Sequence, residues 1–106
     1  MKLDVNGTLR SSKGADVASA STTTLGNDGN FFDITGTAVI SNITIKPAGT
    51  MVVLKFNSNI NIQSGTVGVS GALRLSGAAT FGATQYDTLT LISDGTNWWE
   101  TARSLN

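Results

Sequence analysis

The sequence contains no cysteine and no histidine, and it has a single proline among its 106 residues. Without cysteine, the chain can form neither a disulfide bond nor a thiolate metal site. Without histidine, it lacks the commonest general base and the most frequent protein ligand of transition metals. Any catalysis would therefore have to rest on carboxylates.

The carboxylates are placed as structural residues. Asp28 and Asp94 lie in turn signals, where such side chains accept hydrogen bonds from backbone N–H groups. Asp33 alternates with apolar neighbours, as a residue on the solvent face of a strand does. Residues 27–30 loosely resemble a calcium loop, but the full set of oxygen ligands and the bidentate acid are missing. We expect a protein that is not an enzyme and that binds no cofactor and no metal ion.

Charge is scarce as well, because charged residues make up only 13% of the sequence and seven basic residues balance seven acidic ones. The basic residues are scattered and form no stripe that could bind a phosphate backbone, so we expect no nucleic-acid partner. A near-neutral surface has little electrostatic repulsion and tends to associate. This favours copies of the chain itself, or a larger assembly, as partners; a polar monomer kept soluble by hydroxyl groups is the alternative.

Long apolar runs are missing too. No stretch approaches the roughly 20 apolar residues of a membrane span, and the first residues lack the apolar core of a secretory signal. We expect synthesis in the cytoplasm and no membrane partner.

The strongest pattern that is present lies between Thr50 and Ile62, where apolar and polar residues alternate with a period of two. This period is typical of a β-strand and not of a helix, and the Asn-Ser-Asn sequence at 57–59 indicates a bend or bulge within it. The apolar side is expected to hold Val52, Leu54, Phe56, Ile60 and Ile62. No segment shows apolar residues at helical spacing, so the chain is predicted to be all-β.

Two weaker strands precede this one. Residues 31–34 form a short apolar run that should end at Gly36, and residues 37–45 should form a second strand. The second strand is expected to have Val39, Ile43 and Ile45 on one face and Ile40 on the other. Pro47 must interrupt the chain after it, because proline cannot donate to a strand ladder.

The clearest local signal is a hairpin near the end of the chain. Residues 87–92 and 97–101 flank an Asp-Gly turn at 94–95, and Asp-Gly is a strong hairpin signal. Trp98 and Trp99 are adjacent, so their side chains should point to opposite faces of the strand. We expect one ring to close the core and the other to lie at an interface; a sugar-stacking platform is the alternative for the exposed ring.

Residues 1–20 differ from the rest, with few apolar side chains among scattered charges. We expect an N-terminal arm over residues 1–20 and a β-rich domain over residues 21–106. Met1, Leu3 and Val5 alternate, so the arm could add as a strand to an edge offered by a partner; a frayed terminus is the alternative. Short antiparallel strands in a β-sandwich and a β-helix or prism-like body both fit the glycine-bounded segments after residue 65.

Four segments together resemble a module of tailed-bacteriophage fibre, appendage and head-decoration proteins. They read ASASTTTLG at 18–26, NFFDITGT at 30–37, KPAGT followed by VVLKF at 46–56, and DTL to SDGTNW at 87–98. The resemblance implies an intertwined homotrimer whose strands share a core around a threefold axis. The residues that it implies for this trimer core or interface are Val52, Leu54, Phe56, Ile60, Ile62 and Trp98.

The same resemblance implies a non-enzymatic virion structural protein, and the short chain suits a capsid decoration (cement) protein or a short head fibre. Such a protein would lie on the capsid surface and bind the major capsid protein or another virion protein. Its anchor would be residues 1–20, with Met1, Leu3, Val5 and Leu9 as the apolar contacts. The alternative is a receptor- or glycan-binding module of a tail fibre, in which Trp99 contacts a host surface glycan. A fragment of a secreted adhesin is a third possibility.

Overall fold

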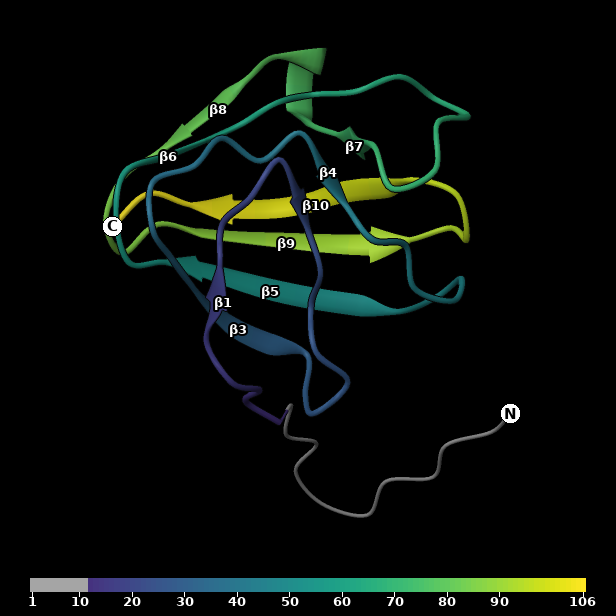
Figure 1. Ribbon diagram of the computed structural model, residues 1–106. Helices are drawn as coiled ribbons and strands as arrows, with labels where there is room; N and C mark the ends of the chain where they lie inside the picture. Colours follow the sequence, from purple (N-terminus) through teal and green to yellow (C-terminus); the bar gives the residue numbers. More distant parts are fainter. Residues whose placement is uncertain (1–11) are drawn as a thin grey trace.

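The computed structural model describes residues 12–106, and within them it contains β-strands, turns and one 3₁₀ helix but no α-helix (Figure 1). The all-β prediction is therefore confirmed. The strands are β1 (Val17–Ala18), β2 (Thr22–Thr23), β3 (Phe31–Thr35), β4 (Asn42–Ile43), β5 (Met51–Phe56), β6 (Ile60–Ile62), β7 (Leu73–Arg74), β8 (Phe81–Ala83), β9 (Thr88–Ser93) and β10 (Trp98–Ser104), and the 3₁₀ helix η1 is Ser76–Ala78.

One six-stranded sheet, in the order β1-β3-β5-β9-β10-β7, forms the body of the molecule. Its four central strands lie side by side in Figure 1, and the sheet curls around the core. Two short sheets, β2-β4 and β6-β8, cover the concave side. The prediction of antiparallel strands holds only in part, because β1 with β3, β3 with β5, β7 with β10 and β2 with β4 pair in parallel.

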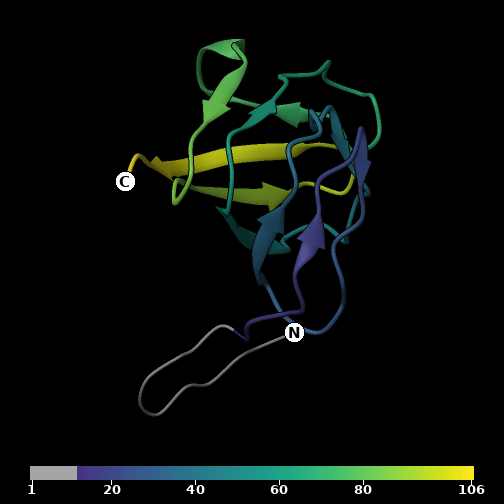
Figure 2. The same ribbon diagram turned by 60° about the vertical axis from the view of Figure 1, so that its left-hand side comes forward.

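The parallel pairs arise because the chain crosses to a second sheet and returns before it adds the next strand to the main one. From β1 it passes through β2 to β3, and from β3 through β4 to β5 (Figure 2). Partners on successive turns lie 17 to 22 positions apart, as in Val17 with Ile34 and Phe31 with Val53. A chain that crosses over before it returns to the main sheet runs in its original direction, so the new strand pairs in parallel. A tight hairpin reverses the chain and gives an antiparallel pair.

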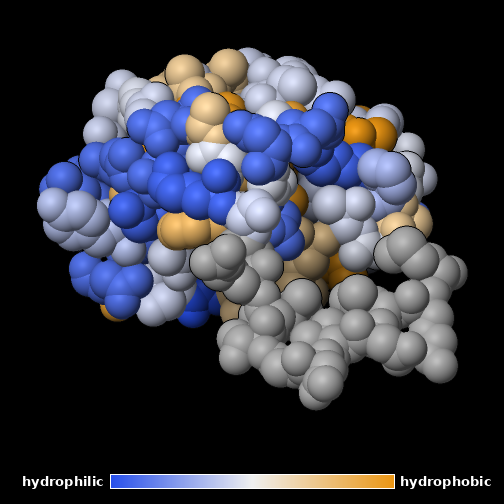
Figure 3. All heavy atoms as spheres, turned by 90° about the horizontal axis from the view of Figure 1, so that it is seen from below, coloured by the Kyte–Doolittle hydropathy of each residue, from blue (hydrophilic) through white to orange (hydrophobic). Residues whose placement is uncertain are grey.

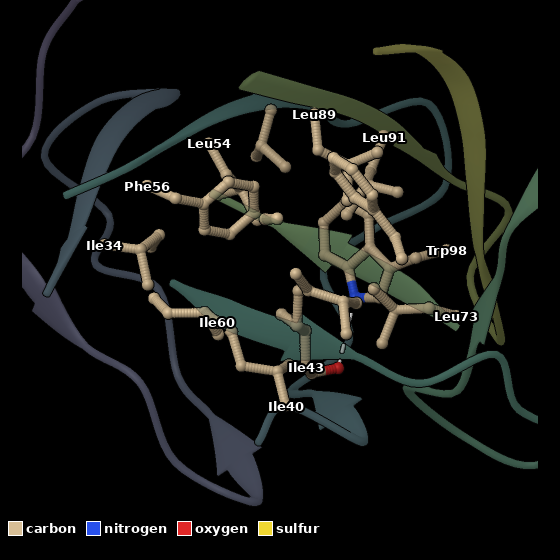
Figure 4. Close-up of a cluster of buried hydrophobic side chains, with 14 of the residues drawn as sticks. Ile34, Ile40, Ile43, Leu54, Phe56, Ile60, Leu73, Leu89, Leu91 and Trp98 are labelled. Carbon is tan, nitrogen blue, oxygen red and sulfur yellow. Dashed lines mark hydrogen bonds between the residues drawn. The ribbon is translucent and has the colours of Figure 1, made fainter. Parts of the chain in front are cut away.

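The strongest predicted strand is confirmed as β5 and β6, separated by a bend at residues 57–59. Its apolar side faces the core. The side chains there are at most 1% exposed, and they are Val52, Leu54, Phe56, Ile60 and Ile62. Ile34, Leu89, Leu91 and Trp98 complete the same cluster from β3, β9 and β10 (Figure 4). The described part of one chain therefore builds a continuous core.

The face assignment for residues 37–45 was wrong. Only Asn42–Ile43 form a strand there, and Ile40 and Ile43 are both buried while Val39 is 41% exposed. The N–H groups of Ser41 and Asn42 both donate to the carbonyl of Ser21, at 3.1 and 3.0 Å. In a regular strand, successive N–H groups point in opposite directions. Because the N–H groups of Ser41 and Asn42 point the same way, the alternation of side chains is broken here, and Ile40 and Ile43 reach the same face although they are three residues apart.

The predicted hairpin is confirmed as antiparallel β9 and β10, with Trp98 opposite Ser93. The Asp94 carboxylate accepts the N–H groups of Thr96 and Asn97 at 2.8 and 2.7 Å, and Gly95 has a φ of 94°. Glycine adopts this left-handed geometry without the clash that a Cβ would cause. The Asp-Gly pair therefore specifies the turn.

Asn97 and Trp98, which follow this turn, connect three parts of the fold. The Trp98 indole N–H donates to the carbonyl of Ile43 at 3.1 Å in the buried interior, which ties β10 to β4 (Figure 4). The Asn97 amide donates to the carbonyls of Val69 and Ala72 at 2.9 and 3.1 Å, and its oxygen accepts the N–H of Gly68 at 2.9 Å. A strand-end side chain thus orders the loop before β7.

Part of the predicted N-terminal arm lies along the main sheet. Lys13 forms a parallel bridge with Phe31, and Val17–Ala18 pair with Ile34–Thr35 as the edge strand β1. Residues 1–11 lie outside the described residues.

We predict that Trp98→Phe lowers the free energy of unfolding by about 2–4 kcal/mol, because a buried carbonyl loses its donor and part of the core volume is emptied. Urea unfolding followed by far-ultraviolet circular dichroism measures this loss. The matched control is Trp99→Phe, for which the exposed position predicts a loss of about 1 kcal/mol or less. Equal losses in the two variants would contradict the structural role of the buried indole.

A second prediction concerns Asp87, a buried carboxylate that accepts the N–H groups of Thr84 and Asn106, each at 2.9 Å. These bonds, that from Thr84 first, lower the pKa of Asp87 below its usual 3.8. A lowered pKa in the folded state means that the carboxylate stabilises the fold above about pH 4 and that this contribution is lost as the pH falls through the folded-state pKa.

Asp87→Asn should therefore reduce the free energy of unfolding at pH 7, and the difference from the parent protein should shrink towards pH 3. Denaturant titrations at a series of pH values measure the difference. A gap that is constant with pH would show that the charge of Asp87 plays no part.

Candidate interaction surface

Apolar side chains form a row on the outer face of the main sheet. Met51, Ile92 and Trp99 stand directly opposite one another on β5, β9 and β10. Met51 is 45% exposed and Trp99 is 38% exposed, while Ile92 between them is half-buried. We call these three residues the outer apolar row. Such a row on the outer side of a sheet is available for contact with another molecule.

The outer face becomes more polar with distance from this row. In the next row along the strands, half-buried Val53 of β5 still has an apolar partner, Phe31, on one side and has Thr90 on the other. Farther along, Asp33 forms ion pairs with Lys55 at 3.2 Å and with Lys13 at 3.5 Å. In the view from below Figure 1, hydrophilic residues predominate and apolar residues form small separate areas (Figure 3). The outer face therefore has an apolar end and a charged end.

The ring of Trp99 is held in place by the turn that precedes it. Its indole N–H donates to Oδ2 of Asp94 at 2.8 Å, while Oδ1 of the same carboxylate caps the turn. The hydrogen bond from the N–H of Asn97 and then that from the Trp99 indole lower the pKa of Asp94 below 3.8. One carboxylate thus fixes both the turn and the orientation of the exposed ring.

A second feature is a groove at the end of the molecule where the described chain begins. It has a volume of about 500 Å³ and lies between the edge strands β1 and β2. Its walls are residues 15–18, 20, 22–24 and 26–28. A smaller groove of about 260 Å³ lies beside it, lined by residues 24, 25, 27 and 44–47. We call the larger one the N-terminal groove; small and hydroxyl side chains line much of it.

The structure places the six residues assigned to a trimer core or interface inside a single chain. The exposure of Val52, Leu54, Phe56, Ile60, Ile62 and Trp98 is 0 to 1%. Because their own chain already buries them, contacts between copies would have to use other residues. Trp99 is exposed on the opposite side of β10 from Trp98, as the alternation predicted. Met1, Leu3, Val5 and Leu9, the predicted anchor, lie outside the described residues.

Sequence reasoning missed two members of the outer apolar row, Met51 and Ile92. A signal existed, because Met51 and Val53 are apolar residues on the polar side of the strongest strand. Ile92 gave no such signal. Only the register of β9 between β5 and β10 brings it beside Met51 and Trp99.

From residue 12 onward, no three His, Cys, Asp or Glu side chains gather where they could hold a metal ion. No helix within the same range is long and apolar enough to cross a membrane.

Comparison of the chain with protein-family models, with curated proteins and with solved structures gives no match in any of the three.

The Asp94–Trp99 contact can be tested by its pH dependence. Because the pKa of Asp94 is lowered in the folded state, the contact should persist through neutral pH and weaken as the pH falls below 3.8. The two indole N–H signals in a ¹H–¹⁵N NMR spectrum report on it separately. We expect the Trp99 signal to shift in this range while the Trp98 signal, from the buried bond to Ile43, stays in place.

Asp94→Asn is the control for this titration, and it should abolish the acid shift of the Trp99 signal. A Trp99 signal that does not respond to acid in the parent protein would contradict the contact.

Proposed function

We propose that this chain is a non-enzymatic structural protein of a tailed-bacteriophage virion, either a capsid decoration protein or a short head fibre, that acts as a homotrimer. The observation that carries the proposal is the outer apolar row of Met51, Ile92 and Trp99, exposed on a sheet of a small, charge-poor body. The segment resemblance supplies the virion context. The absence of histidine and cysteine from the sequence agrees with an adhesive role rather than a catalytic one.

The outer apolar row supports association because the body already has its own core. The concave side of the sheet is filled from within the chain, so apolar groups on the convex side contribute little to folding. Burying them against a partner would remove apolar surface from water, a gain of about 25 cal/mol for each Å². Trp99 is the natural anchor of such a contact, since tryptophan is enriched at the centres of interfaces.

The trimer proposed here consists of complete subunits that meet at their surfaces. An intertwined core would require Val52, Leu54 and Phe56 to face other chains, yet all three are buried within their own. Side-by-side contact through the outer apolar row needs no such exchange. Binding to a shell then follows from multivalency, because three subunits engage symmetric sites together and weak single contacts combine.

We predict that Met51→Lys converts the trimer into monomers. A charged ammonium group within the interface would be desolvated without a partner. Native mass spectrometry or light scattering after gel filtration measures the mass. Thr101→Lys, an exposed change at the irregularity of β10 and outside the apolar row, should leave the trimer intact.

Circular dichroism should confirm that both variants remain folded. A parent protein that is monomeric at micromolar concentration would remove the physical basis of the proposal, and a Met51→Lys trimer would show that the interface lies elsewhere.

The virion assignment is tested by counting copies of the protein in purified particles. Hundreds of copies on the head agree with a decoration protein, and a few copies at the tail agree with an appendage. Particles that contain none would contradict both.

A second candidate function, glycan binding, is favoured by one observation. The Trp99 ring is exposed, and its bond to Asp94 fixes its orientation, as a sugar-stacking platform requires. Trp99→Ala should then abolish binding on a glycan array while Met51→Lys preserves it. If Trp99→Ala binds glycans as well as Met51→Lys does, the Trp99 ring does not contact the sugar and its role is in subunit association.

A further inference from the structure

The edge of β2 that faces away from β4 has no partner among the described strands. On its inner side, the carbonyl of Ser21 accepts the N–H of Asn42 in β4 at 3.0 Å, and the carbonyl of Thr23 accepts the N–H of Thr44, just after β4, at 2.9 Å. Main-chain groups in a parallel strand alternate in direction from residue to residue. The N–H and C=O groups of Thr22 and Thr24 therefore point to the outer edge.

The N-terminal groove lies along this same edge, with Thr22 and Thr24 in its wall. An unpaired strand edge can pair with a further extended segment, and the groove beside it could receive that segment's side chains. The described structure thus has space for one more strand at this end.

Side chains of β2 and β4, and of the residues beside them, match at a spacing of 20 positions. The hydroxyl groups of Thr24 and Thr44 are 2.8 Å apart, and those of Ser21 and Ser41 are 3.3 Å apart. Thr23 is paired with Ile43, and both side chains are buried. Along β2 and the residues after it, positions 23 and 25 are buried while positions 22 and 24 are exposed.

The same spacing extends to the start of the chain. Twenty positions before the buried Thr23 and Leu25 stand Leu3 and Val5, both apolar. Twenty positions before the exposed Thr22 and Thr24 stand Lys2 and Asp4, both charged. An aspartate opposite Thr24 also continues the row of hydroxyl contacts, because its carboxylate can accept the threonine O–H.

The length of the connection agrees as well. Val53 and Lys13 both pair with Phe31, one on each side. Asn42 of β4 precedes Val53 by eleven positions, and Lys2 precedes Lys13 by the same number. The connection that joins β4 to β5 is therefore as long as the one that an added strand at Lys2 would need.

We propose that the outer edge of β2 and the N-terminal groove form a binding site for residues 1–7 of the same chain, which add as a parallel strand with Lys2 opposite Thr22. Leu3 and Val5 then enter the groove, next to Thr23 and Leu25. This assignment gives those two side chains a role within their own subunit, in place of contacts to a shell.

A disulfide tests the register, and the natural absence of cysteine makes the experiment clean. In the double variant Lys2→Cys with Thr22→Cys, the two Cα atoms of paired neighbours would be about 5 Å apart, within the range of a disulfide. In the control Lys2→Cys with Thr44→Cys, one more strand and two residues along it separate the two positions, and the distance is about 12 Å.

We expect mild oxidation to cross-link the first variant within one chain and to leave the control reduced, as read by non-reducing electrophoresis and intact mass. Equal cross-linking of the two variants would contradict the register. A disulfide only between chains would overturn the assignment to the same chain and point to exchange of the segment between copies.

Stability gives an independent measurement. Leu3→Asp should lower the midpoint of thermal unfolding by about 5 °C or more, because it places a carboxylate in the groove. Lys2→Glu, an outward change next to it, should shift the midpoint by less than about 2 °C. If residues 1–7 contact only a shell, neither change alters unfolding of the isolated protein. That result would overturn this proposal and leave the proposed virion role untouched.

Discussion

The hydrogen bond from the Trp98 indole to the carbonyl of Ile43 connects the two sides of the molecule. It joins β10 of the main sheet to β4 of the small sheet across the core, where neither group has access to water. A buried carbonyl without a donor raises the free energy of the folded state. The bond therefore fixes the distance between β4 and the main sheet. Asn97 acts beside it, since its amide orders the loop that leads into β7. The position of β4 over the main sheet, and of β2 that pairs with it, follows from this cross-connection.

Because one chain completes this core, the function has to be sought on its outer surfaces. The inner side of β5 and β6 is used for folding, which leaves the outer side of the same strands free to associate. Met51 and Val53 stand on that outer side although the alternation of the strand would place polar residues there. Apolar residues at positions that the fold does not need are more informative about a partner than the core residues, whose role is packing.

Patterns within one segment predicted strands and turns correctly. They did not predict how distant segments pair with one another. The alternation from Val52 to Ile62 and the Asp-Gly turn at 94–95 are local, and the structure has both. Parallel pairing depends on which strand the chain lies beside when it returns after a crossover, and no residue type in the sequence indicates that strand. The carbonyl of Ser21 accepts the N–H groups of both Ser41 and Asn42, which shifts the face of Ile43, and it belongs to a neighbouring turn of the chain. The outer apolar row requires the register of three strands, so only Trp99 could be named from the sequence.

The two ends of the main sheet, with the small sheets beside them, differ in whether their strand edges are covered. At one end, β7 and the bridge between Asn42 and Ala72 bring the main sheet against the small one. At the other end, β1 and β2 border the N-terminal groove, and exposed main-chain groups there would pair with any extended segment of matching pattern. A segment from the same chain has the advantage of high effective concentration over one from a partner. An edge covered in this way could no longer add strands from other copies, so association would be left to the outer apolar row.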